Sequence, residues 1–207
     1  MMMAEPTIKI DIFRKKTVEE FSSLLADPES RLDSGSAAAS VAAVAASLLE
    51  RAARQIAAEH ADDKNESQLD WYIRNSKILR CYMVNLIDED VKCRGPLRRA
   101  LKEGDERKIE ASRQAAVSIC LEIVNMMGKC LEMSEGLLPF AASRSSSYVV
   151  ECAELAYAAS LAAGNYILEM SCFSPDETYR YVMKRENELT MQQQKERMNY
   201  ILSGTSE

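Results

Sequence analysis

An alanine-rich stretch from Ser34 to Ala58 constrains the fold of this chain more than any other segment. Eleven of the 23 residues from Ser36 to Ala58 are alanine. Alanine is the best helix former and carries almost no side-chain bulk, so the stretch predicts a helix that another helix can approach closely. The Ser34-Gly35-Ser36 turn at its start leaves the first backbone N–H groups accessible, and such groups favour an anion. These three residues are therefore candidate binding residues.

The composition favours one helical domain spanning residues 1–207. Hydrophobic residues make up 47% of the chain, and there are only seven glycines and five prolines, which indicates long helices rather than many turns. A chain of 207 residues can bury a sizeable core within one domain. We therefore expect an all-α protein, an up-and-down bundle of about five or six long helices.

Charge and cysteine usage argue against several classes of protein. The formal net charge of −6 gives no support for nucleic-acid binding, which usually needs a basic face. The uncharged run from Ser34 to Leu49 is shorter than the roughly 18 apolar residues of a membrane span, so no membrane association is expected. The six cysteines form no CxxC pair and His60 is the single histidine, which argues against a metal site of the zinc type. Reduced thiols in a cytoplasmic protein are the expectation.

Capping signals predict where several helices begin and end. Thr17 and Glu20 have the spacing of a capping box, from which a short helix continues to Ala26. The pair Gly95-Pro96 is expected to break or kink the third helix. In the segment Ser174-Pro175-Asp176-Glu177, the serine is expected to cap the last helix, with the proline in its first turn.

A second helix rich in small residues is expected from about Ser147 to Cys172. Its residues Ala153, Ala156, Ser160 and Ala163 lie three or four positions apart, so they share one face of the helix. Two faces of small residues allow two helix axes to approach closely. The alanine-rich helix is therefore the expected partner of this face.

Three carboxylates end an apolar helix face in the segment Leu86-Ile87-Asp88-Glu89-Asp90. A carboxylate at the margin of an apolar face can be partly desolvated, which suits it to proton transfer. Asp88 and Asp90 are thus candidate acid–base residues, and the alternative is a charged turn on a solvated face. Elsewhere, Ser146 and Ser147 lie in a serine-rich approach to a helix N-terminus. Such an approach can bind a carboxylate or phosphate, or act only as a cap.

The order of these features resembles the cyclodeaminase/cyclohydrolase family of folate enzymes, which includes formiminotetrahydrofolate cyclodeaminase domains and methenyltetrahydrofolate cyclohydrolases. In that family a glycine-rich turn opens an alanine-rich helix, matched here by Asp33–Ala38. A later Leu-Ile-Asp-x-Asp motif is matched by Leu86–Asp90, the most specific part of the resemblance. Another small-residue helix with an asparagine, matched by Asn165, closes the core. The resemblance covers roughly residues 17–172.

The resemblance implies a homodimer that binds a tetrahydrofolate derivative and opens or closes the five-membered ring carrying its one-carbon unit. It implies no metal and no cofactor beyond the folate substrate. Acid–base catalysis falls to Asp88 first and to Asp90 second. The other implied substrate-binding residues are Ser34, Gly35 and Ser36 for the pterin or a glutamate carboxylate, Tyr82 or Tyr148 for the ring, and Ser146 and Ser147.

A non-catalytic binding or assembly module with the same fold is the competing hypothesis. Gly35 stands where the family has three glycines, and Ser146-Ser147 takes the place of a serine–aspartate pair. The last helix is polar around Gln192–Gln194, so it is expected to be partly exposed or to rest on a partner subunit.

Overall fold

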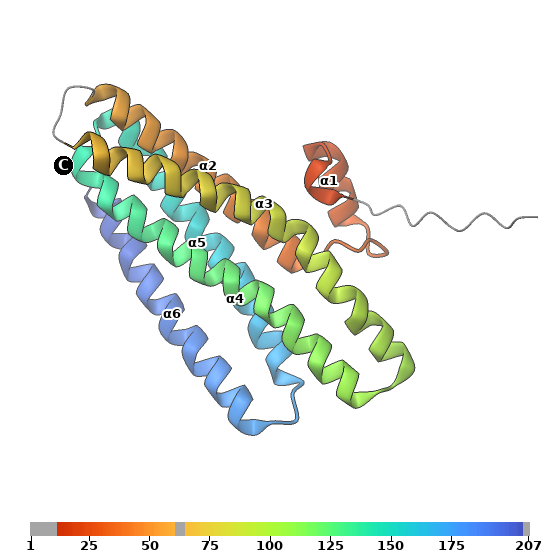
Figure 1. The fold of residues 1–207 in the computed structure, drawn as a ribbon. Helices are drawn as coiled ribbons and strands as arrows, with labels where there is room; N and C mark the ends of the chain where they lie inside the picture. Colours follow the sequence, from red (N-terminus) through yellow and green to blue (C-terminus); the bar gives the residue numbers. More distant parts are fainter. Residues whose placement is uncertain (1–11, 61–64, 205–207) are drawn as a thin grey trace, which may run out of the picture.

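The protein is an all-α bundle, as the composition predicted (Figure 1). The computed structural model describes residues 12–60 and 65–204, and no strand occurs in these ranges. In chain order the elements are η1 (Phe13–Lys15), α1 (Val18–Ala26), α2 (Ser34–Glu59), α3 (Glu66–Glu103), α4 (Glu106–Leu137), η2 (Leu138–Phe140), α5 (Ser143–Cys172) and α6 (Glu177–Ser203).

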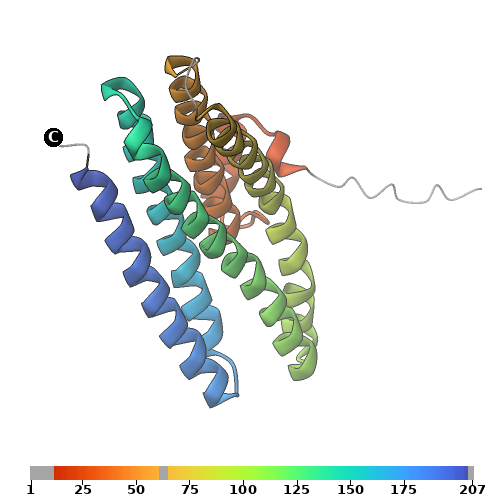
Figure 2. The same ribbon diagram turned by 60° about the vertical axis from the view of Figure 1, so that its left-hand side comes forward.

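Helices α2 to α5 form a four-helix bundle, and α6 lies on its outer side. Each of these helices packs against the next, and α5 returns to lie beside α2. Helix α6 contacts α5 and α4, as both views show (Figure 1 and Figure 2). The short helix α1 lies beside the bundle and buries none of its residues fully.

The alanine-rich helix α2 is the core of the bundle. Eight of its eleven alanines are buried, and so are the small residues predicted on one face of α5. Because neither face carries bulky side chains, the two helices lie side by side in close contact, which confirms the predicted pairing. The buried small residues of α5 are Ala153, Ala156, Ser160 and Ala163.

Helix α2 is also the one helix among the described residues that is long and apolar enough to cross a membrane. Of its most apolar window, 61% is buried inside the bundle. Its apolar surface is therefore covered by α3, α4 and α5, as in the core helix of a helical bundle.

The capping box at α1 is present as predicted. The Thr17 hydroxyl accepts from the Glu20 N–H at 3.2 Å, and the Glu20 carboxylate accepts from the Thr17 N–H at 2.8 Å. The helix ends at Ala26, where the sequence placed its end.

Two of the predicted helix starts are wrong, and the break that Gly95-Pro96 could have caused does not occur. Helix α3 continues through Pro96 to Glu103 without a break, because the buried residues Leu97 and Ala100 hold its last turns against the bundle. Helix α5 begins at Ser143, one turn earlier than expected.

The third correction concerns the start of α6. Asp176, not Ser174, is its N-cap, and the Asp176 carboxylate accepts from the N–H groups of Thr178 and Tyr179 at 2.9 and 3.1 Å. The Ser174 hydroxyl instead donates to Glu110 on α4 at 2.9 Å. A carboxylate two residues further on is thus the better cap, because the serine is already bonded to a neighbouring helix.

Candidate functional site

A buried network of charges joins the start of α2 to the middle of α3. The Arg94 guanidinium donates from Nε to Asp90 Oδ1 at 3.0 Å and forms a second ion pair with Asp33, the N-cap of α2. The other oxygen of Asp90 accepts from the Ser36 hydroxyl at 2.8 Å. Asp90 is completely buried and Arg94 is 4% exposed, so the two charges compensate each other inside the protein.

Gly35 is required by this network. A β-carbon at this position would overlap with the carboxylate of Asp90, so that only glycine lets the first turn of α2 lie against α3 here. Gly35 and Ser36 are buried, whereas Ser34 is partly exposed. Of the three residues predicted at the helix tip, Ser34 therefore faces solvent, and the other two pack against Asp90.

Tyr166 of α5 closes the network from the other side. The Arg94 guanidinium carbon lies 4.2 Å from the centroid of the Tyr166 ring, within the range of a cation–π contact. Burial raises the pKa of the Tyr166 hydroxyl to about 12. Burial opposes the charge on Arg94, but Asp90 raises the pKa of the guanidinium above its ordinary value. Arg94 is therefore a permanent cation.

A cleft of about 400 Å³ opens beside Arg94 and Tyr166. We call it the Arg94 cleft. Its walls combine polar and apolar side chains from the start of α2, the end of α3, α4 and the end of α5. Its charged residues are Asp33, Arg94, Arg98, Arg113 and Glu169, and its apolar residues include Leu97, Leu101, Met170 and Phe173.

The charges of the Arg94 cleft differ in how they are compensated. Arg113 pairs with Glu110 at 2.7 Å. Arg98 donates to the Ser30 carbonyl at 3.3 Å and has no carboxylate partner among the described residues. The Glu169 carboxylate has no hydrogen-bond or ion-pair partner in the described part of the chain. Arg98 and Glu169 are therefore the groups of the cleft that remain available to a ligand.

Asp88 is bound to η1 rather than to the network around Asp90. Its carboxylate accepts from the N–H groups of Phe13 and Arg14 at 2.8 and 3.2 Å and pairs with the Arg14 side chain at 3.4 Å, which fixes η1 to α3. It borders a second cleft, of about 410 Å³, that is also lined by Arg31 and Arg99. Asp88 is 6% exposed, so neither it nor Asp90 belongs to a solvated helix face.

The remaining predicted residues lie far from the Arg94 cleft. Tyr82 donates to Glu122 of α4, and this hydrogen bond raises the pKa of the Tyr82 hydroxyl to about 12. Ser146 and Ser147 lie in the first turn of α5, where Ser145 contacts Glu59 at the opposite end of α2. Within one chain, the structure therefore brings together Ser34, Gly35, Ser36 and Asp90, but places Tyr82, Ser146 and Ser147 elsewhere.

His60 and Tyr148 also lie at this opposite end of the bundle. His60 is the C-cap of α2, and its Nε2 lies 3.0 Å from the Phe140 carbonyl oxygen. The ring of Tyr148 stacks under Arg51, at 4.6 Å. No group of three or more His, Cys, Asp or Glu side chains in the described ranges is arranged to hold a metal ion.

Sequence reasoning missed several residues of the cleft, among them Arg94, Arg98, Tyr166 and Glu169. Arg94 follows Asp90 by four positions, a spacing at which opposite charges pair on one helix, and this signal was available. Tyr166 and Glu169 carry no such signal, because only the packing of α5 against α3 and α4 brings them to Arg94.

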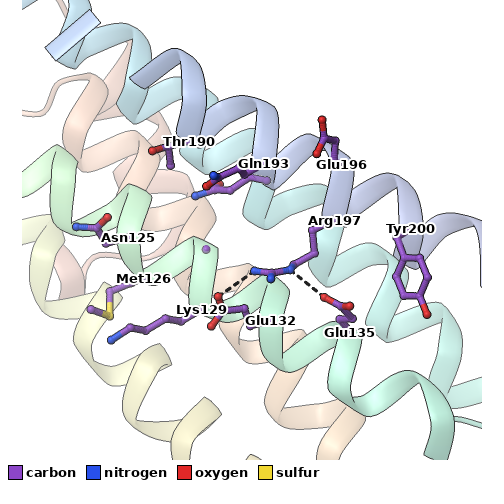
Figure 3. A pocket seen from close by; sticks show the side chains of 12 residues that line it. Asn125, Met126, Lys129, Glu132, Glu135, Thr190, Gln193, Glu196, Arg197 and Tyr200 are labelled. Atoms are coloured by element: carbon purple, nitrogen blue, oxygen red, sulfur yellow. Dashed lines mark hydrogen bonds and ion pairs between the residues drawn. The ribbon is translucent and has the colours of Figure 1, made fainter. Parts of the chain in front are cut away.

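A groove of about 980 Å³ lies between α4 and α6 (Figure 3). Arg197 of α6 bridges Glu132 and Glu135 of α4 across it, at 2.9 and 2.8 Å. Its lining includes neither Asp88 nor Asp90 and none of the residues predicted at the tip of α2. The Arg94 cleft is smaller, but it combines a buried cation, an aromatic ring and a free carboxylate, and it is therefore the candidate site.

Comparison with known proteins agrees with this architecture. A sequence profile of the family described as formiminotransferase-cyclodeaminase matches residues 17–188. Among solved structures, a formiminotetrahydrofolate cyclodeaminase from Thermotoga maritima is similar, with a TM-score of 0.80 and 20% sequence identity. The match covers 92% of this chain and 97% of that chain. At this identity the structural likeness concerns the fold alone. Comparison with proteins of curated function gave no match.

Proposed function

Because this chain belongs to the formiminotransferase-cyclodeaminase family, we propose that it binds a tetrahydrofolate derivative in the Arg94 cleft and acts on a C–N bond of its one-carbon unit. The reaction opens or closes the five-membered ring that carries this unit. Water or ammonia is the nucleophile or the leaving group. One observation supports the proposal best. In a chain of this family, a single cleft combines arginines, a tyrosine ring and an unpaired carboxylate.

The walls of the cleft suit the parts of a folate. A pterin is a flat heteroaromatic ring, and Tyr166, Leu97, Met170 and Phe173 offer it an aromatic and apolar surface. The glutamate tail of a folate carries carboxylates, which arginine side chains bind with charge-assisted hydrogen bonds. Arg98 is the arginine of the cleft that has no carboxylate partner in the described ranges.

Ring opening and closing need a group that moves a proton. The attacking nitrogen or water must lose a proton, and the departing nitrogen must gain one. Glu169 is the free carboxylate of the Arg94 cleft, so we assign this role to it. The sequence-based candidates were Asp88 and Asp90, and both are occupied by hydrogen-bond donors of the protein itself.

Glu169→Gln is expected to lower turnover by about 10²-fold or more, which is typical for loss of a general acid–base group. The purified protein is mixed with 5,10-methenyltetrahydrofolate, and the loss of its absorbance is followed. Glu154→Gln, at an exposed glutamate of the same helix, is the matched control and is expected to behave like the wild type.

Asp88→Asn in the same assay separates the two assignments. It weakens the attachment of η1 and is expected to cost less activity than Glu169→Gln. If Asp88→Asn abolishes turnover while Glu169→Gln does not, the proton-transfer role belongs to Asp88. If the wild type does not accelerate the reaction in either direction, the enzymatic proposal is refuted.

A non-catalytic folate-binding module is the second candidate function. The full set of protein partners on Asp88 and Asp90 favours it, because neither carboxylate of the family-like motif is free for chemistry. Saturable folate binding without turnover would select this alternative.

We also propose that the protein is a homodimer, as the family resemblance implied, and that it is cytoplasmic, as its cysteine usage suggested. The outer surface of α6 supports a partner there, because it exposes large apolar side chains. These side chains are Tyr181, Val182, Leu189 and Tyr200.

A further inference from the structure

Arg94 is shared by two carboxylates with very different exposure. Asp90, behind the guanidinium, is completely inaccessible and is held by the Ser36 hydroxyl as well. Asp33 lies at the mouth of the Arg94 cleft, and 47% of its side chain is exposed. The pair with Asp90 is therefore a fixed part of the core, whereas the pair with Asp33 is solvated on one side.

The two oxygens of Asp33 have separate partners. Oδ1 accepts from the Ser34 N–H at 2.8 Å and thereby caps α2, and Oδ2 pairs with Arg94. The Asp33 carboxylate is well hydrated when the pair separates, but the Arg94 side chain is only 5% exposed and needs another anion in its place. A carboxylate from outside can thus displace Oδ2 from Arg94 at low cost.

We propose that Arg94 determines the specificity of the cleft for a carboxylate, and that Asp33 is a displaceable stand-in for this carboxylate. On binding, a carboxylate of the ligand takes the place of Asp33 on the guanidinium, and the Asp33 side chain turns into solvent. The inference rests on the proposed function for the identity of the ligand, whose glutamate tail supplies the carboxylate.

The exchange leaves the buried charges balanced. Arg94 keeps its contacts with Asp90 and the Tyr166 ring, and one carboxylate simply replaces another on its outer nitrogen. A neutral ligand gains nothing from Arg94, because it would strip the cation of Asp33 without replacing the charge. The site therefore selects for a carboxylate and not merely for an aromatic ring.

Asp33→Ser tests the stand-in, because serine still caps a helix but carries no charge. The probe is N-(4-aminobenzoyl)-L-glutamate, which has the tail of a folate without its pterin, and its Kd is measured by calorimetry. We expect Asp33→Ser to bind it about two- to five-fold more tightly than the wild type, because the probe no longer competes with the partly exposed Asp33 carboxylate for Arg94. The dimethyl ester of the probe is expected to show no such gain.

Two variants control for other effects. Asp105→Ser removes an N-cap carboxylate of similar exposure from α4, and is expected to leave the Kd unchanged. Glu169→Gln removes a negative charge from the same cleft without touching Arg94. An equal gain in Glu169→Gln would mean a general electrostatic effect and would overturn the proposal, as would unchanged or weaker binding by Asp33→Ser.

The experiment also separates this inference from the proposed function. Suppose that Asp33→Ser tightens binding of the probe but the protein neither binds nor converts 5,10-methenyltetrahydrofolate. The displacement of Asp33 by a carboxylate is then supported, and the folate proposal is refuted. If the folate is converted but the probe binds alike in all variants, the folate proposal stands and the stand-in is refuted.

Discussion

Arg94→Leu is expected to lower the free energy of unfolding by about 3–5 kcal/mol, the cost of leaving a buried charge without its partner. The variant keeps Asp90, which is fully buried. The Ser36 hydroxyl would then be the remaining side-chain donor to its carboxylate. It also loses the contact with the Tyr166 ring. Urea unfolding followed by circular dichroism at 222 nm measures the change, with the slope of the transition as a check on cooperativity.

Two further variants make this prediction specific. Arg98→Leu, one turn further along α3, removes an arginine that contacts a carbonyl and is expected to cost less than about 1 kcal/mol. Adding Asp90→Asn to Arg94→Leu removes the stranded charge and is expected to restore part of the lost stability. A single Arg94→Leu variant as stable as the wild type would show that Asp90 is not held as an ion in the core.

Gly35→Ala is expected to destabilise the protein by about 1–3 kcal/mol, although alanine favours a helix. The new β-carbon would overlap with the Asp90 carboxylate, which cannot move aside easily because Ser36 and Arg94 hold it. The same substitution at Gly95 of α3 is the matched control. A β-carbon there would meet only the end of the Arg99 side chain, at 4.0 Å.

Gly95→Ala is accordingly expected to leave the stability unchanged or to raise it by up to about 1 kcal/mol. Thermal and urea unfolding of both variants give the comparison. The same gain in both would disprove the close contact between the first turn of α2 and Asp90.

The helices of this protein could be predicted because their signals are local. Thr17 and Glu20 form a capping box within four residues, and the alanine content of α2 fixes both its helicity and its close packing. Pro96 misled the prediction, because the burial of the residues after it outweighs the hydrogen bond that proline cannot make. The family, inferred from the turn at Asp33–Ala38 and the Leu86–Asp90 motif, is confirmed by the match over residues 17–188.

The site could be predicted only in part, because it depends on contacts between distant segments. Asp33 and Arg94 are 61 positions apart, and the sequence around each residue contains no local signal that predicts their pairing. The motif around Asp90 drew attention to the turn of α3 that contacts the start of α2, but it did not predict the direction in which each carboxylate points. Asp88 holds η1 and Asp90 holds α2, so two acidic residues only two positions apart serve two different attachments.

The start of the alanine-rich helix is therefore a different kind of anion site from the one that its sequence suggested. The tip of α2 carries an anion already, the Asp33 carboxylate, which caps the helix and reaches Arg94. The small residues that follow bring this tip close enough to α3 for the pair to form. The sequence pattern thus pointed to the tip of α2 and to Asp90, which the structure brings together, and tertiary packing determined the charges around them.

Binding of 5-formyltetrahydrofolate to cleft-filling variants tests whether folate occupies the Arg94 cleft. Met170→Trp fills the Arg94 cleft, and Met126→Trp, at another half-buried methionine, fills the groove between α4 and α6. If folate occupies the Arg94 cleft, calorimetry will show saturable binding by the wild type, a loss of about ten-fold or more in Met170→Trp, and no change in Met126→Trp. Equal affinity in Met170→Trp and the wild type, or no binding by the wild type, would contradict the account.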